Sequence, residues 1–520
     1  MKKVRALTKY ELINFKKSKL FWTILILYAI GIVLSVYPYF SFEKSFVSFI
    51  MNSWIPMNVI MVPCLLVAIN VGKSENEIFN YLDISNKEKI LSKLMPLGII
   101  SLAILIINIV IATVFAIISN ISFQNYIYES AGYILNTILF LIVSMIIGLF
   151  VGKKVVKKTG EVVGVIISIG VFLLLTNFFR FFNVVIPIIN IRQMSNSFDP
   201  ISYDRTYLYH NVFWFLVSYI LFEITFWRNR CKKITRVVKA LTIITSIICC
   251  IFLGQKIYSL KPVLYDSGKG IISETPERKM EIRETFKSEE EKKYYAYKYD
   301  MNIKTDNEFY NDCTINIKML EDKVDSIELG FYKNFNISQL KIDHKAMDFT
   351  RGKNSVKIQL PKTFNRGEEI VLNIKYSGYI NISWHQNQQL LFVRNNGLCL
   401  AGPFEWYPKQ NDGREKEYKV SIISEGKNKI YSNLDQIEQS EGIHLNGKDR
   451  EIILVKGNLK VQEYKGYKII GNEELINDKE KLDFVIRTRG KLKNTKTIIQ
   501  VPLEYYIDEF YDNAIIVKGL

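Results

Sequence analysis

The sequence predicts an α-helical polytopic membrane domain of about seven transmembrane helices, followed by an all-β domain built as an antiparallel sandwich or saddle. Long apolar runs fill the first 260 residues, and short alternating runs fill the rest of the 520-residue chain. Of the 68 Lys and Arg residues 26 fall in residues 1–260, against 11 of the 51 Asp and Glu residues. The net charge of +17 therefore belongs mostly to the apolar half. A basic excess between apolar runs indicates a membrane rather than nucleic acid, and it excludes a wholly soluble enzyme.

The apolar half contains seven runs long enough to be transmembrane candidates. They are Leu20–Tyr39, Ile50–Val71, Leu97–Ile118, Gly132–Val151, Val162–Phe179, Val212–Trp227 and Ala240–Leu260. The first run has a long basic leader and no small-residue cleavage site, so we expect an uncleaved start-transfer helix rather than a signal peptide. The sixth run is the shortest of the seven. We assign residues 20–260 to this membrane domain.

The basic residues predict the orientation of the spans. With a cytoplasmic N-terminus, the inside segments contain 21 Lys and Arg residues, whereas the outside loops contain only Lys44, Arg180, Arg192 and Arg205. This asymmetry follows the positive-inside rule for a multi-pass protein of the plasma membrane. An odd number of spans then places the C-terminal domain outside. If either the sixth or the seventh span is wrong, that domain lies in the cytoplasm.

Residues 1–19 interleave apolar side chains with lysines. Such a segment suits a cytoplasmic interfacial helix, with its apolar side toward the lipid and its ammonium groups toward phosphates. The alternative is a basic flank that only sets the topology of the first span.

The connection between spans two and three, Gly72 to Lys93, combines an acidic start with an apolar stripe at helical spacing. The residues that define it are Glu75, Glu77, Ile78, Tyr81 and Leu82. A short amphipathic helix on a cytoplasmic loop suits docking of a nucleotide-binding partner, because apolar side chains enter a groove and charges set the register. The alternative is an amphipathic loop that rests on the bilayer.

This order of elements resembles the ABC-2 type exporter permeases over residues 1–235. The matching positions are Glu75 and Glu77, Tyr81-Leu82, a turn at Ser85-Asn86, and Lys93 ahead of span three. The family also has a broken, partly re-entrant outer segment, and Phe181–Asn190, which follows Arg180, is similar to it. The resemblance implies a permease subunit, paired as a homodimer or heterodimer, with a cytoplasmic ABC ATPase as partner.

No nucleotide-binding motif is present in the chain. Gly72-Lys73-Ser74 looks like the end of a phosphate-binding loop, but Val67 stands where that motif needs a glycine. We therefore expect no cofactor on this chain, and we expect ATP and Mg²⁺ to be bound by the partner subunit. We expect no nucleic-acid partner, and the lipid bilayer is the other partner.

Glu223 is the one acidic residue inside an apolar run. Intramembrane carboxylates are candidate functional groups. Glu223 also lies only four residues before Trp227, so its side chain can instead reach the membrane interface. Arg180 is the second polar candidate near a span.

The polar half begins with a juxtamembrane linker, residues 261–296, and continues as a β domain over residues 297–520. Strictly alternating runs such as Thr314–Lys318 and Val356–Leu360 predict half-buried strands. Further runs at Val371–Tyr376, Leu390–Val393, Tyr418–Ile423, Ile452–Val455, Phe484–Arg487, Ile498–Val501 and Ile515–Val517 predict more strands.

The β half resembles the amino-terminal β domain of aminopeptidase N-like zinc peptidases. The matching residues include Leu360-Pro361, the turn Arg366–Glu369, Tyr376-Ser377-Gly378 and Trp406-Tyr407-Pro408. The zinc chemistry needs H-E-x-x-H, but His210, His344, His385 and His444 are tens of residues apart. We therefore predict a peptidase-like fold with no zinc site, no metal and no catalytic residue.

Cys313 and Cys399 are the two cysteines of the predicted outer domain. An outer domain lies in an oxidising compartment, so we predict a possible Cys313–Cys399 disulfide. The function predicted for the whole chain is a non-enzymatic permease subunit of an ATP-driven exporter. The alternative is a membrane-anchored extracytoplasmic β-domain binding or sensor protein without transport activity.

Overall fold

The computed structural model divides into two compact units, a helical unit that ends at Ser259 and a β-rich unit that begins at Leu260. It describes residues 2–17, 64–72, 86–155, 205–226, 233–259, 263–266, 270–272, 293–306, 308–384, 388–402, 404–410, 412–426, 428–439, 442–487, 497–501, 509–510 and 514–517, with isolated residues 22, 26, 28–33, 46, 49–50 and 170.

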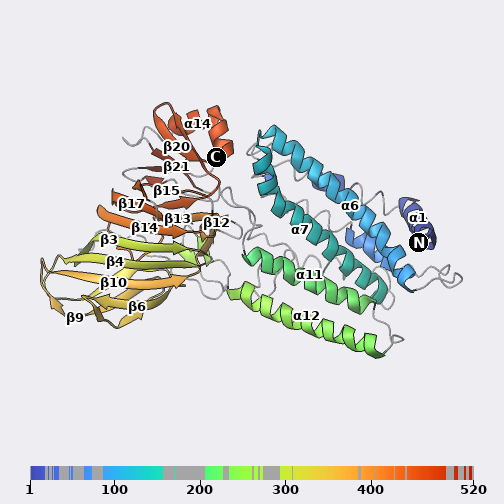
Figure 1. The fold of residues 1–520 in the computed structure, drawn as a ribbon, viewed down its shortest axis with the longest axis horizontal. Coiled ribbons are helices and arrows are strands. Elements are labelled where there is room, and N and C mark those ends of the chain that lie inside the picture. The colour runs from blue at the N-terminus through green and yellow to red at the C-terminus, as the bar shows by residue number, and fades with distance from the viewer. Residues whose placement is uncertain are drawn as a thin grey trace. The chain divides into compact units, whose positions relative to one another are not determined.

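Besides the helical segment 64–72, the described part of the helical unit includes one short amphipathic helix and four long apolar ones (Figure 1). They are α1 (Lys2–Lys17), α6 (Asn86–Ile118), α7 (Phe123–Phe150) with its π-helical extension η1 (Val151–Val155), α11 (Arg205–Thr225) and α12 (Lys233–Ser259). Helix α1 packs on the first half of α6, where Thr8 Oγ1 lies 3.6 Å from Met95 Sδ. Helices α6, α7, α11 and α12 follow one another side by side, each in contact with the next.

Among the described residues, four helices are long and apolar enough to cross a membrane: Ile90–Ile118, Phe123–Val155, Tyr207–Thr225 and Arg236–Ser259. They coincide with the third, fourth, sixth and seventh predicted spans. The fifth predicted span, and most of the first and second, lie outside the described residues. Large apolar side chains on α6 and α12 point outward, among them Leu102, Val110, Leu241 and Ile248. A surface of this kind suits lipid rather than water.

The described strands of the β-rich unit form four sheets. Its largest sheet has eight strands, which in order across the sheet are β16 (Asp435–Gln439), β17 (Gly442–Asp449), β14 (Lys416–Ser424), β3 (Tyr294–Thr305), β4 (Phe309–Met319), β10 (Glu369–Gly378), β6 (Asn336–Ile342) and β7 (Lys345–Ala346). The three-stranded sheet has the order β5 (Val324–Gly330), β9 (Ser355–Phe364) and β8 (Phe349–Arg351).

The seven-stranded sheet contains β1, the first strand of the unit in the sequence. Its order is β15 (Ile430–Ser432), β18 (Leu454–Lys456), β13 (Leu398–Leu400), β12 (Gln388–Val393), β11 (Asn381–Trp384), β1 (Val263–Asp266) and β2 (Gly270–Ile272). Strands β1, β2 and the first residues of β3 fall within residues 261–296, which we predicted to be a linker. That part of the chain is therefore partly sheet.

Strict alternation correctly predicted the central strands. In β4 every second side chain is buried, so that Ile315 and Ile317 enter the core while Thr314 and Asn316 are more exposed. One continuous hydrophobic core joins residues of all four sheets, with Trp406, Tyr299 and Tyr376 among its largest fully buried side chains.

The C-terminal part of the β-rich unit is not all-β, and this corrects the prediction. Two short helices, α13 (Glu473–Asn477) and α14 (Lys479–Val485), lie in the chain between β20 (Tyr467–Gly471) and the parallel strand β21 (Thr497–Gln500). The predicted strand at Phe484–Arg487 is wrong, because its first two residues end α14. The sheet order is β19 (Lys460–Tyr464), β20 (Tyr467–Gly471), β21 (Thr497–Gln500), β23 (Ile515–Val517) and β22 (Glu509–Phe510). Parallel pairing also joins β3 to β14 and β1 to β11, so a purely antiparallel domain is excluded.

Candidate functional site: the basic end of the helical unit

Two contacts bring the basic ends of different helices together. Lys153 Nζ, in η1, lies 4.4 Å from the centre of the Phe226 ring, just beyond α11. Glu223 on α11 and Lys239 on α12 form an ion pair with 2.7 Å between Oε2 and Nζ. The last turn of α7, the last turn of α11 and the first turns of α12 therefore lie at one end of the unit. Helix α6 starts at this end too, because it is joined to α7 by the tight turn Ser119–Ser122 at the other.

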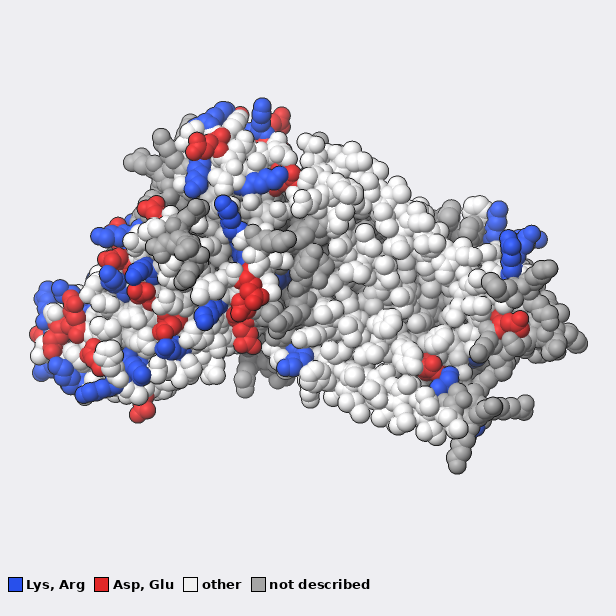
Figure 2. Space-filling model, in the orientation of Figure 1, with Lys and Arg blue, Asp and Glu red and all other residues white. Residues whose placement is uncertain are grey.

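The two ends of the helical unit differ sharply in charge. The described basic residues at the first end, which we call the basic end, are Lys2, Lys3, Arg5, Lys9, Lys16, Lys17, Lys87, Lys89, Lys93, Lys153, Lys154, Lys233, Arg236 and Lys239. At the opposite end the described part of the chain has Arg205 and Lys256 as its basic residues. Figure 2 shows a cluster of Lys and Arg near α1 and an almost uncharged band across the helices.

A close contact of small residues holds the helical segment 64–72 against α7. A Cβ added at Gly148 would lie 2.6 Å from both Leu65 O and Ala68 Cβ. A Cβ added at Gly72 would lie 2.9 Å from Leu149 O and 3.3 Å from Gly152 Cα. Gly148 and Gly152 are four residues apart on one face, and glycines at this spacing let membrane helices approach closely. Because Ala68 meets Gly148 and Gly72 meets Gly152, the two helices run in the same direction.

Lys93 closes the connection between this segment and α6. Its Nζ donates a hydrogen bond of 3.0 Å to the backbone oxygen of Val71. The last described residues before 73–85 and the first turns of α6 therefore lie in contact at the basic end. Lys93, which the sequence analysis assigned to the docking loop, makes this contact.

The other predicted docking residues, Glu75, Glu77, Ile78, Tyr81 and Leu82, lie outside the described residues, as does Arg180. Glu223 is described, and its ion pair with Lys239 lies at the basic end of the helical unit. Both interpretations of Glu223 stay predictions.

The structure does not contain the predicted disulfide. Cys313 on β4 and Cys399 on β13 are both fully buried, and neither sulfur forms a disulfide. They lie in different sheets, each inside the apolar core. An apolar environment raises the pKa of the Cys313 thiol well above its ordinary value and so disfavours the reactive thiolate.

The described histidines lie in separate parts of the fold. His210 is on α11, His344 is in the turn between β6 and β7, and His444 is on β17 with its Nδ1 3.0 Å from Ser421 Oγ. Within the described part of the chain, no group of three His, Cys, Asp or Glu side chains is arranged to hold a metal ion. His385 lies outside the described residues.

Sequence reasoning missed a polar contact in the helical interior. Tyr133 on α7 donates a hydrogen bond of 2.9 Å to Asn108 Oδ1 on α6, and Asn108 Nδ2 donates to Ile104 O and to Tyr28. Thr113 and Tyr126 make a second contact between the same helices, with 2.9 Å between their oxygens. Polar side chains in membrane helices bond across the interface in this way. Spacing alone gave no signal for these pairs, because the partners are 25 and 13 residues apart.

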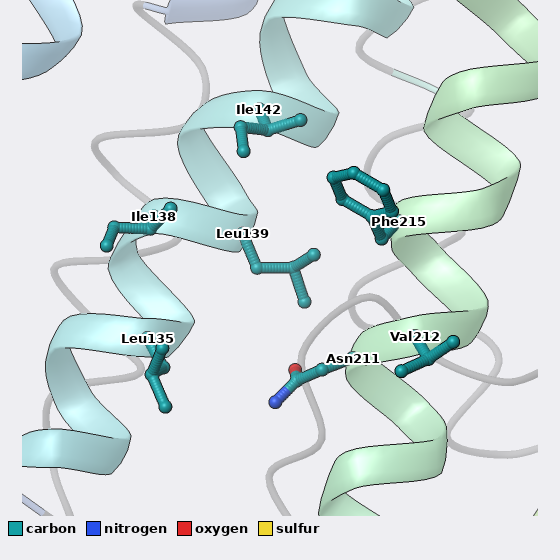
Figure 3. A pocket seen from close by; sticks show the side chains of 7 residues that line it. All are labelled: Leu135, Ile138, Leu139, Ile142, Asn211, Val212 and Phe215. Carbon is teal, nitrogen blue, oxygen red and sulfur yellow. The ribbon is translucent and has the colours of Figure 1, made fainter.

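An apolar pocket of about 300 Å³ lies between α7 and α11. Figure 3 shows Leu135, Leu139 and Ile142 of α7 facing Val212 and Phe215 of α11, with Asn211 as the polar side chain of its lining. A pocket of this size and lining suits an apolar group rather than a charged one.

The β-rich unit contains buried charges that hold loops in place. Lys456 is fully buried, and its Nζ donates to Asn395 O at 2.5 Å, to Ser424 Oγ at 2.8 Å and to Glu425 O. Lys416 and Asp412 form a buried ion pair at 2.6 Å, although the second carboxylate oxygen of Asp412 has no hydrogen-bond partner among the described residues. Both lysines donate within the fold, so they act as structural contacts.

No known family model and no curated protein matches the sequence. Solved structures similar to the β-rich part include an M1 zinc metallopeptidase from Deinococcus radiodurans, with 12% identity over 44% of this chain and a TM-score of 0.34. Leukotriene A4 hydrolase from Saccharomyces cerevisiae is similar at 14% identity over 44% of this chain, also with a TM-score of 0.34. The matches span 61% and 41% of those two chains.

Proposed function

We propose that this chain is the membrane-spanning permease subunit of an ATP-driven exporter and that a separate ABC ATPase docks on its basic end. The observation that carries the proposal is the contact between the two described segments that flank residues 73–85. Lys93 Nζ donates to Val71 O, so the described residues before and after this stretch lie close together at the basic end. The amphipathic pattern Glu75–Leu82 in the sequence between them suits a groove on a soluble partner.

The helix directions support a cytoplasmic basic end. Positive residues are retained on the cytoplasmic side during membrane insertion. Helix α12 starts at the basic end and ends at the opposite one, so the β-rich unit follows on the extracytoplasmic side. Val155 and Arg205 lie at opposite ends of the unit, which agrees with a crossing at the predicted fifth span. Segment 64–72 runs toward the basic end, as the predicted second span requires.

In this proposal the partner subunit, and not this chain, binds ATP and Mg²⁺. The chain has no phosphate-binding loop of its own, and its helical unit offers apolar surfaces and a few buried polar contacts. Permeases of this kind work in pairs, and rocking of the helices would follow from movement of the docked ATPase.

Co-purification tests the proposal. The full chain, tagged and extracted in mild detergent from its native membrane, should bring down a polypeptide with a phosphate-binding loop, identified by mass spectrometry. Tyr81→Asp together with Leu82→Asp should reduce its recovery about tenfold or more, because two charges replace the apolar contacts.

The matched control carries the same substitution on exposed apolar residues of the β-rich unit, Ile423→Asp with Ile437→Asp, which should leave recovery unchanged. Equal recovery with the loop variant would show that the ATPase docks elsewhere. Absence of any ATPase from the unsubstituted chain would favour the anchored β-domain binding protein instead.

A further inference from the structure

A groove of about 440 Å³ lies between α11 and α12. Leu216 and Tyr219 line it from α11, and its lining on α12 includes Leu241, Thr242 and Thr245. The Tyr219 hydroxyl donates to Thr242 Oγ1 at 3.4 Å and so links the two helices, whereas Leu241 and Thr245 are exposed. Both helices are long and apolar enough to cross a membrane, where a groove open to the outside is filled by acyl chains.

One lysine of α12 lies where this groove meets the basic end. Lys239 is three residues before Thr242, so it lies on the same side of α12, one turn nearer the basic end. Its Nζ forms the 2.7 Å ion pair with Glu223 Oε2. The side chain of Lys239 stays about one-third exposed, so its ammonium group is accessible from outside the unit.

A second lysine lies on the other side of α11. Lys153 Nζ is 4.4 Å from the centre of the Phe226 ring. Phe226 continues the last turn of α11 and follows Tyr219 by seven residues, so the two rings leave the same face of that helix about two turns apart. Two ammonium groups therefore flank the end of the groove that is nearest the basic end.

The charges at this end of the groove suit one anion. Two ammonium groups and the Glu223 carboxylate leave an excess of one positive charge, which equals the single negative charge of a phosphodiester. An ammonium group has three donors, and the ion pair of Lys239 uses one of them. Charge-assisted hydrogen bonds to phosphate oxygens are strong, and basic pockets between membrane helices bind anionic lipid head groups.

We propose that the groove between α11 and α12 binds one anionic phospholipid, with an acyl chain along Leu216, Leu241 and Thr245 and the phosphate between Lys153 and Lys239. The inference requires that the helical unit lies in a membrane, and it does not depend on transport or on an ATPase. Glu223 then has two opposing effects, because it holds Lys239 beside the groove while its own charge repels the phosphate.

Photo-crosslinking of the full chain in detergent micelles tests this inference. The probe is phosphatidylglycerol with a diazirine on one acyl chain, and mass spectrometry locates the crosslinks. We expect them within residues 216–219 and 241–246. Half-displacement of the probe should need about fivefold less unlabelled phosphatidylglycerol than phosphatidylcholine with the same chains, which is the effect of one net positive charge near the head group.

Charge variants should change this preference for phosphatidylglycerol in opposite directions. Lys153→Met should remove most of the fivefold preference. Glu223→Gln should raise it by about the same factor, because it removes the repelling charge and keeps an acceptor for Lys239. Lys9→Met removes an exposed lysine of α1 at the same end and should leave the preference within about twofold. A rise in one variant and a fall in another cannot both come from damage to the fold.

A bulky side chain in the groove tests the place of the acyl chain. Thr245→Trp should remove the crosslinks, whereas Ile247→Trp, on the opposite face of α12, should keep them. Both positions are exposed, so the fold should accept either ring. Equal displacement by the two lipids, equal effects of Lys9→Met and Lys153→Met, or crosslinks that persist in Thr245→Trp would overturn the inference. None of these results bears on recovery of the ATPase, which tests the proposed function separately.

Discussion

Lys456 shows how a single charged residue holds the β-rich unit together. Its ammonium group lies in the interior, where it donates to oxygens of the turn at Asn395 and of the end of β14. A buried charge costs free energy unless every donor is used, and here three donors meet three acceptors. The residue therefore fixes three separate segments at one point.

Lys456→Met should lower the free energy of unfolding by about 3 kcal/mol, because three part-buried oxygens lose their donor. Lys419→Met, an exposed lysine with a weak 3.9 Å ion pair to Asp300, should change it by less than about 0.5 kcal/mol. Urea unfolding followed by tryptophan fluorescence measures both. Equal effects of the two substitutions would contradict the structural role of Lys456.

Buried tyrosines make the β-rich unit sensitive to alkaline pH. Desolvation raises the pKa of Tyr294 to about 12 from its ordinary value of 10.0, and raises the pKa values of Tyr299, Tyr376 and Tyr418 well above theirs. When the pKa of a group is higher in the folded than in the unfolded state, the group stabilises the folded state fully at pH values below its unfolded-state pKa. This stabilisation is lost as the pH rises through the folded-state pKa.

We therefore expect the free energy of unfolding to fall between pH 10 and 12, with a contribution of about 2 to 3 kcal/mol from Tyr294 alone. Urea midpoints at a series of pH values, together with phenolate absorbance, follow this loss. A midpoint that stays constant from pH 9 to pH 12 would contradict the buried state of these phenols.

At the scale of the element, alternation in the sequence predicted the strands correctly where one face is buried. Val356, Ile358 and Leu360 all enter the core from β9, as their spacing requires. The strand predicted at Phe484–Arg487 is wrong because a short apolar run is compatible with a helix as well as with a strand. Here Leu482 and Val485 pack in the core as residues of a helix. Contacts between residues far apart in the sequence, such as Lys93 with Val71, cannot be predicted from hydrophobic periodicity, since only the fold brings the two residues together.

The contact between segment 64–72 and α7 depends on the absence of a side chain at Gly148. Gly148→Ala would place a methyl group 2.6 Å from Leu65 O and from Ala68 Cβ, so we expect a loss of about 1 to 3 kcal/mol or separation of the helices. Gly98→Ala on α6 meets nothing within 4 Å and should be neutral or slightly stabilising. Thermal unfolding of the full chain in detergent compares the two variants. The prediction is wrong if Gly98→Ala is the more damaging substitution.

At the scale of the whole molecule, the two units carry different surfaces. The helical unit has an almost uncharged band with basic residues gathered at one end, whereas acidic and basic side chains are interspersed over the β-rich unit (Figure 2). The first surface suits a bilayer and the second suits water. The sequence anticipated this division from charge counts alone, and the structure adds that the basic ends of separate helices meet at one end.

Cysteine accessibility in intact cells tests this account most directly. In a background without native cysteines, Ser338→Cys on β6 and Lys154→Cys in η1 introduce exposed thiols in the β-rich unit and at the basic end. A membrane-impermeant maleimide should label Ser338→Cys in intact cells, and should label Lys154→Cys only after the membrane is permeabilised. Labelling of Lys154→Cys in intact cells, or of neither position, would contradict an extracytoplasmic β-rich unit with a cytoplasmic basic end.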